Sequence, residues 1–190
     1  MRIPHPGRLS RGALAGLALV LLAGCSAREP EGTADEPSSR TLAAALDGDD
    51  DHDALARIAG AAGLADVFEG VGPYTVFAPA DAALDAEGVP DFTAEERRAE
   101  GAALVRAHVV PGALTRQDIV AAIERAGGDG VAMRTMADGL LTFSRENGGI
   151  VVVAANGARG RLVGEETATR NGVIQPVDAL LVRPEPAPAG

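Results

Sequence analysis

Few side chains of this 190-residue chain are suited to covalent or acid–base chemistry. The single cysteine, Cys25, follows an apolar run, and His52 lies in the acidic segment 47–53. Another histidine, His108, stands where a predicted helix meets a predicted strand. A thiol can act as a nucleophile, and an imidazole can act as a general base or a metal ligand. These residues are therefore the first candidates for a functional site.

The acidic segment Asp47–Asp53 invites a metal-binding interpretation, because it holds five aspartates and one histidine. An EF-hand loop that began at Asp47 would need glycine at its sixth position and glutamate at its twelfth. The chain has His52 and Ile58 at these positions. The alternative is a solvated loop whose last acid, Asp53, caps the next helix. We predict the solvated loop and no metal site.

Serine chemistry has equally little support in the sequence. Ser26, Ser38 and Ser39 lie in a polar spacer, and Ser144 lies in a predicted strand without the Gly-x-Ser-x-Gly turn that exposes a nucleophile. The glycine-rich motifs of dinucleotide-binding and P-loop proteins are absent from the sequence. We therefore predict no catalytic residue, no cofactor and no enzymatic activity.

His108 has two possible roles. It could contact a partner or act in catalysis, or it could be fixed inside the domain by a hydrogen bond, with Asp81 as a candidate acceptor. We favour the structural role. Asp81, His108, Val109 and Val110 are the residues of the domain that we expect to serve either as structural supports or as partner contacts.

The segment that precedes Cys25, residues 1–24, has three parts. Residues 1–12 are basic, Ala13–Leu22 is apolar but too short to span a bilayer, and small residues precede the cysteine. This layout is typical of a secretory signal peptide. Leu22-Ala23-Gly24-Cys25 also resembles the bacterial lipoprotein box, which implies acyl chains on Cys25 after cleavage before it. The alternative is an ordinary signal peptide in which Cys25 is incidental.

Charge excludes one large class of partners. Of 17 basic residues, three lie in the leader, so 14 remain against 27 acidic residues, a formal charge of −13. A nucleic-acid-binding protein needs a basic surface, so no nucleic acid is expected. An anionic bilayer would repel the mature chain, and membrane attachment would depend on the acyl chains.

Composition divides the chain into four parts. Residues 1–24 form the signal peptide, and residues 25–40 form the lipidated cysteine and a disordered spacer without large apolar side chains. Residues 41–183 form one domain, and 184–190 form a proline-rich tail. We expect the domain to be monomeric.

Helices dominate the first half of the predicted domain and strands dominate the second, which indicates an α+β fold. Capping residues predict helices that start after Asp53, Thr93 and Thr115. Strands are predicted at 74–78, 108–110, 131–136, 140–145, 150–154, 161–163 and 173–182. The Asn-Gly pairs at 147, 156 and 171 predict tight hairpins.

Three segments together resemble the fasciclin domain family: GPYTVFAPADAAL at 72–84, AHVVPGALT at 107–115 and NGVIQPVDALLV at 171–182. The resemblance implies a wedge-shaped β-sandwich of about seven strands with flanking helices. It also implies a role in adhesion or extracellular protein binding without catalysis. Many members have tyrosine before the histidine of the second segment and histidine in the closing strand, where this chain has Ala107 and Gln175.

These features predict a lipid-anchored protein of the bacterial cell envelope that presents a non-catalytic domain to a protein partner. The anchor would lie in the outer membrane of a two-membrane host, or on the outer face of the plasma membrane otherwise. The alternative is an envelope enzyme or a small-ligand-handling protein that uses a pocket of the same domain.

Overall fold

Two strands that lie far apart in the sequence, β1 (Tyr74–Pro79) and β8 (Gly172–Val177), pair in parallel at the centre of the fold. The structure is a computed structural model that describes residues 38–86 and 88–183. Every residue of the two strands except Tyr74 is buried. The pair therefore has packing partners on both faces, as buried parallel strands require.

The first half of the described chain is mainly helical, as predicted. Its helices are α1 (Leu42–Leu46), α2 (Ala54–Ala61), α3 (Ala65–Glu69), α4 (Asp81–Leu84), the 3-10 helix η1 (Glu95–Arg97), α5 (Arg98–Ala107) and α6 (Arg116–Arg125). Within residues 38–86 and 88–183, no helix is long and apolar enough to cross a membrane.

The strands form two four-stranded sheets. The remaining strands are β2 (Val109–Pro111), β3 (Val131–Arg134), β4 (Leu140–Glu146), β5 (Gly149–Ala154), β6 (Arg159–Arg161) and β7 (Thr167–Thr169). One sheet has the order β2-β1-β8-β7, and the other is the antiparallel meander β3-β4-β5-β6. The α+β class is confirmed, with eight strands in the described residues rather than about seven, because β7 has no sequence signal of its own.

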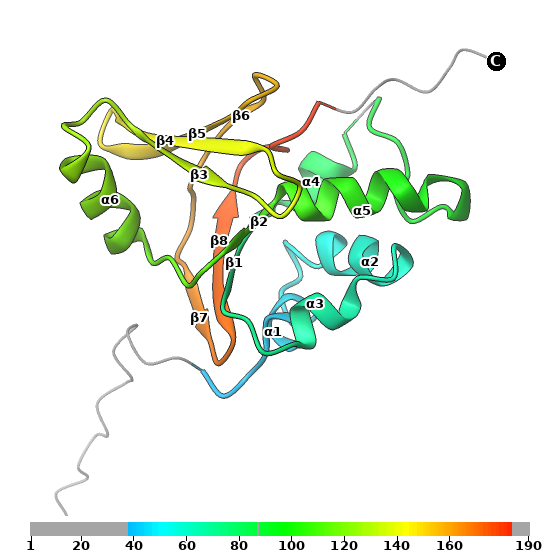
Figure 1. Ribbon diagram of the computed structural model, residues 1–190. Helices are drawn as coiled ribbons and strands as arrows, with labels where there is room; N and C mark the ends of the chain where they lie inside the picture. Colours follow the sequence, from blue (N-terminus) through cyan, green and yellow to red (C-terminus); the bar gives the residue numbers. More distant parts are fainter. Residues whose placement is uncertain (1–37, 87, 184–190) are drawn as a thin grey trace, which may run out of the picture. The chain divides into compact units, whose positions relative to one another are not determined.

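Alternate residues of β1 face two different cores. Val76 and Ala78 pack with α1, α2 and α5, whereas Phe77 packs with α6 and the second sheet. The ring centroids of Phe77 and Phe143 lie 5.1 Å apart. Figure 1 shows the helices α1, α2, α3 and α5 on one side of the β1–β8 pair and the sheet with α6 on the other.

Several local predictions are confirmed, and the predicted cap at Thr93 is wrong. Thr115 and Asp118 form a reciprocal capping box at the start of α6, and Asn147-Gly148 turns between β4 and β5 with positive φ angles. Thr93 does not cap a helix. Its amide and its hydroxyl both donate to the Asp91 carboxylate, so Thr93 closes a turn before η1 instead.

Asn171 lies in a tight hairpin, as predicted, because Arg170 and Asn171 form the turn between β7 and β8, and its side chain also makes long-range bonds that the sequence did not predict. The residue is buried, and its side-chain oxygen accepts a hydrogen bond from the amide of Leu42 at 2.8 Å. Its side-chain NH₂ donates to the carbonyls of Phe68 and Gly70 at 2.9 and 2.8 Å. Asn171 therefore joins the starts of α1 and β8 to the end of α3. A side chain at Gly172 would lie 2.0 Å from the Tyr74 carbonyl, so close approach of β1 requires this glycine.

Replacing Asn171 with alanine should lower the free energy of unfolding by about 2–4 kcal/mol, because three backbone groups, at the start of α1 and the end of α3, lose their partner. Urea unfolding of the full-length chain measures the change. Asn156→Ala is the matched control, since Asn156 is exposed and accepts a single bond from the Ala158 amide within its own turn. Equal effects of the two substitutions would contradict the role assigned to Asn171.

Candidate functional site

His108 lies in the interior and is completely buried. Its Nδ1 lies 2.9 Å from the Leu104 carbonyl, and its Nε2 accepts a hydrogen bond from the Leu181 amide at 3.0 Å. The carbonyl can only accept and the amide can only donate, so the proton is on Nδ1. Burial lowers the pKa of His108 to about 4, although the hydrogen bond to Leu104 opposes the shift. The imidazole is therefore neutral at pH 7.

The expected hydrogen bond between His108 and Asp81 is wrong. The imidazole instead joins the end of α5 to the segment that follows β8. Val109 and Val110 are also buried, at 0% and 4% exposure, in the strand that pairs with β1. The positions of these three residues favour structural support over direct contact with a partner.

Asp81 caps a helix other than its own. Its carboxylate accepts a hydrogen bond from the Ala54 amide at 3.0 Å, at the start of α2, where the side chain of Asp53 makes no capping bond. The Asp81 amide donates to the Asp51 carbonyl at 2.8 Å. Burial raises the pKa of Asp81, the Ala54 amide opposes this, and Asp53 adds to the rise. Asp81 thus fastens α2 to the end of β1.

The acidic segment 47–53 makes contacts within itself. The Nδ1 atom of His52 lies 3.1 Å from a carboxylate oxygen of Asp49, and the Asp51 amide donates to the same oxygen at 3.1 Å. Over residues 38–86 and 88–183, no group of three or more His, Cys, Asp or Glu side chains could hold a metal ion.

Gln175 is a buried polar residue that sequence reasoning noted only as a departure from the family pattern. Its NH₂ donates to the Leu114 carbonyl at 3.0 Å and to the Glu166 carboxylate. Its oxygen accepts from the Arg116 side chain at 3.2 Å, and Arg116 also donates to the Gly164 carbonyl at 2.7 Å. The group joins α6 and the segment before β7 to β8. The sequence signal for this buried contact was a polar residue, Gln175, within an otherwise apolar predicted strand.

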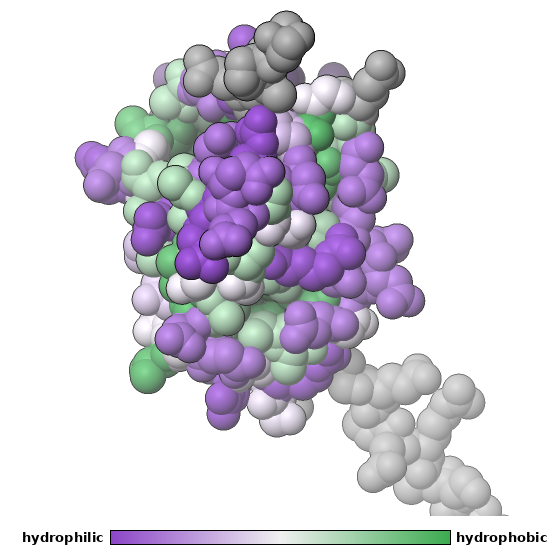
Figure 2. Space-filling model, turned by 90° about the vertical axis from the view of Figure 1, so that its right-hand side faces the viewer, coloured by the Kyte–Doolittle hydropathy of each residue, from purple (hydrophilic) through white to green (hydrophobic). Residues whose placement is uncertain are grey.

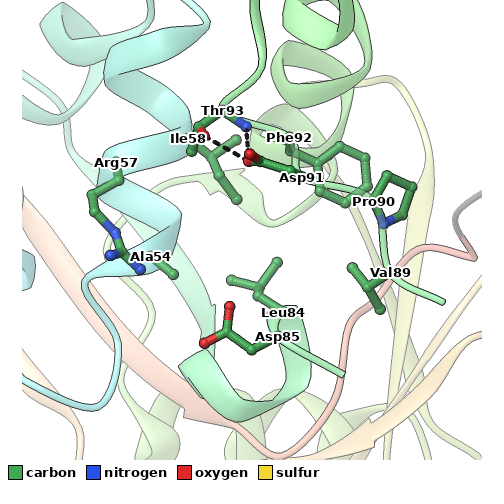
Figure 3. A pocket seen from close by; sticks show the side chains of 10 residues that line it. All are labelled: Ala54, Arg57, Ile58, Leu84, Asp85, Val89, Pro90, Asp91, Phe92 and Thr93. Carbon is green, nitrogen blue, oxygen red and sulfur yellow. Dashed lines mark hydrogen bonds between the residues drawn. The ribbon is translucent and has the colours of Figure 1, made fainter. Parts of the chain in front are cut away.

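An open cavity of about 470 Å³ lies between α2, α4 and the segment 89–93. Figure 3 shows Leu84 and Val89 beside the cavity, with Ile58 and Phe92 across it from Leu84. Leu84, Phe92 and Ile58 are at most 7% exposed, so they form an apolar floor. The sequence predicted neither the cavity nor its lining, because the three segments meet only in the folded chain.

Polar side chains surround this apolar floor. Arg57 stands on α2 with its guanidinium 3.3 Å from Asp53 and 3.9 Å from Asp81. Asp85 and Asp91 lie on different sides of the cavity (Figure 3). Hydrogen bonds from the side chain and amide of Thr93 hold the pKa of Asp91 below its usual value, so this carboxylate is charged at neutral pH.

Gly101 explains why the segment 89–93 can approach the helices. A side chain at Gly101, in the middle of α5, would lie 2.9 Å from the Phe92 carbonyl and 3.2 Å from a methyl group of Ile58. Glycine inside a helix costs about 1 kcal/mol relative to alanine. The close approach of Phe92 accounts for its presence here, and it positions one wall of the cavity.

A second cavity, of about 340 Å³, lies beside the turn before β1 and is lined by Glu69, Val71 and Arg170. Val71 is 96% exposed. Single exposed apolar residues are common on soluble domains. Figure 2 shows the helical face of the domain, where hydrophilic side chains cover most of the surface and hydrophobic areas are small. The first cavity, with its built apolar floor, is the stronger candidate.

The fold and these contacts define an α+β domain whose polar interior is structural and whose candidate site is an open cavity. The chain matches the Fasciclin domain family over residues 50–183, more than half of its length. It therefore belongs to the fasciclin domain family, whose domains are generally non-enzymatic adhesion domains.

One similar solved structure is a FAS1 domain pair from the insect cell adhesion molecule fasciclin I. Sequence identity is 18%, the TM-score is 0.65, and the match covers 77% of this chain and 52% of the other. This chain thus spans about half the length of the domain pair, and the likeness shows the fold. A search of curated proteins finds no match.

The depressed pKa of His108 predicts a pH-dependent stability. Between its ordinary value of 6.5 and about 4, the unfolded chain binds a proton that the folded chain does not. Stability is therefore fully present above pH 6.5 and falls as the pH drops toward 4, by about 3 kcal/mol in total.

His108→Gln tests this directly, because glutamine can keep one donor and one acceptor but does not titrate. Unfolding free energies of the wild type and the variant, measured from pH 8 to pH 4, should diverge below pH 6.5, with the wild type losing more. If the unfolding free energies of the two proteins changed in parallel with pH, the pH dependence would not come from His108.

Proposed function

We propose that this protein is a lipid-anchored component of the bacterial cell envelope whose fasciclin domain binds a protein partner. The observation that carries the proposal is the family match over residues 50–183, because fasciclin domains are of the cell-adhesion type. The interior contacts support it. His108, the histidine that was considered for catalysis, is neutral, buried and bonded to backbone groups.

The anchor rests on the sequence of residues 1–25, which lie outside the described residues. A basic start, a short apolar run and Leu-Ala-Gly-Cys support cleavage before Cys25 and acylation of its thiol. The described chain begins at Ser38, whose amide donates to the Ala168 carbonyl at 3.1 Å. The chain that leads to the anchor would thus join the domain beside β7.

A small-ligand-handling protein is the second candidate function. The cavity of about 470 Å³ favours it, because small-molecule sites have volumes of about 300–1,000 Å³. The match to the fasciclin domain family favours the first candidate, binding of a protein partner. Protein crosslinking and binding of metabolite-sized compounds at the cavity discriminate between the two.

Substitution of Cys25 by serine should move the protein from the membrane fraction to the soluble fraction, because the acyl chains supply the membrane affinity. Fractionation of cells followed by immunoblotting measures this. Ser26→Ala, next to the cysteine, is the matched control and should stay with membranes. Wild-type protein that washes free in buffer would contradict the anchor and leave protein binding by the domain open.

Crosslinking in intact cells, followed by affinity purification and mass spectrometry, should enrich one or a few envelope or surface proteins with the wild-type chain. The control carries the same residues 1–40 and 184–190 around an unrelated domain. Equal recovery from both chains would contradict the binding function and indicate a structural envelope component without a specific partner.

A further inference from the structure

The cavity between α2, α4 and segment 89–93 combines apolar and acidic surface in a way that selects one kind of side chain. Its floor is formed by the buried side chains of Ile58, Leu84 and Phe92. Such a floor can cover the hydrocarbon part of a long side chain. The acidic groups stand at the edge, where Asp85 and Asp91 are exposed to solvent.

Within the described residues, neither of these two carboxylates forms an ion pair. The guanidinium of Arg57, the basic group of the lining, faces Asp53 and Asp81. Asp91 receives hydrogen bonds from Thr93, at 2.9 Å from its amide and 2.6 Å from its hydroxyl. These bonds fix the orientation of Asp91 before any partner arrives and leave its second oxygen without a hydrogen bond in the described residues.

We propose that the cavity receives an arginine or lysine side chain of the protein partner. The methylene groups of that side chain lie over Leu84 and Val89, and its cationic group lies between Asp85 and Asp91. Arginine and lysine bury their methylene groups against apolar surface while the charged end stays at the rim. The inference rests on the proposed protein-binding function and specifies the chemistry of the partner.

Other occupants fit the site less well. An acidic side chain would meet the lining carboxylates Asp85 and Asp91, while the lining guanidinium of Arg57 already faces two other aspartates, Asp53 and Asp81. A purely apolar side chain would desolvate the two carboxylates of the rim without compensation. The charge of the whole chain, −10, also favours approach of a basic partner.

The cavity is accessible in a tethered protein. The described chain begins at Ser38, which pairs with Thr169 of β7, whereas α2, α4 and segment 89–93 line the cavity. Figure 1 shows α4 at the opposite end of the domain from the turn between β7 and β8. The point of attachment and the site of recognition are therefore separate.

The test uses the full-length protein in detergent micelles and the blocked peptide acetyl-Gly-Gly-Arg-Gly-Gly-amide as the probe. Methyl resonances of Ile58, Leu84 and Val89 should shift in a saturable manner during titration, and less at high salt. The same peptide with citrulline in place of arginine keeps the shape and removes the charge. It should cause little shift, and equal shifts by both peptides would overturn the proposal.

The double variant Asp85→Asn/Asp91→Asn should bind the arginine peptide about five- to twentyfold more weakly. Asparagine can still accept the Thr93 hydrogen bonds, so the turn is kept. Asp129→Asn/Asp138→Asn is the charge-matched control, because both aspartates are exposed and flank β3. Unchanged affinity of the first double variant, or equal loss in both, would overturn the proposal.

Crosslinking in cells separates this inference from the function on which it rests. If the Asp85/Asp91 double variant recovers the same partner as the wild type in equal amount, the cavity proposal fails and the binding function stands. If the wild type recovers no partner at all, the binding function fails. Loss of the partner in the double variant alone, with unchanged thermal stability, supports both.

Discussion

The parallel pairing of β1 with β8 is the constraint on which the rest of the structure depends. The register joins residues 74–79 to residues 172–177, and both strands are buried on both faces. One layer therefore serves two cores, with Val76 facing the helices and Phe77 facing the second sheet. Neither the helices nor the meander has a complete apolar partner without this pair, so the whole chain must assemble around a contact of long sequence separation.

Buried polar residues fix the segments that surround this pair. Asn171 holds the start of β8 against α1 and α3, Gln175 holds α6, and His108 holds the segment after β8. Thr75 accepts from the Leu114 amide and donates to the Gly112 carbonyl at the start of β1. A buried polar group without a partner is costly, so each of these bonds favours one arrangement over its alternatives. These buried polar side chains therefore have structural roles in the domain.

The sequence predicted what local chemistry determines. The strand at 74–78, the capped helix after Thr115 and the turn at Asn147-Gly148 each carry their signal within a few residues. The error at Thr93 is local, because Asp91 two residues away accepts its hydrogen bonds, whereas other contacts were missed because a distant segment supplies the partner. Asp81 rather than Asp53 caps α2, and Asn171, besides its predicted place in a hairpin turn, bonds to buried groups of α1 and α3. The cavity depends on contacts such as Phe92 against Gly101, which no local pattern contains.

The proposed recognition site lies on segments that the central pair does not constrain. Asp85, Asp91 and Thr93 are exposed, and they lie in the connection between α4 and η1 rather than in either sheet. Connecting segments tolerate sequence change better than buried strands, while a rigid scaffold keeps them in place. Phe92 anchors the connection to α5, so the side chains on either side of it can differ without repacking the core. Under the proposed binding function, the exposed residues of this connection, such as Asp85 and Asp91, can therefore change partner specificity while the β1–β8 pair and its polar contacts stay the same.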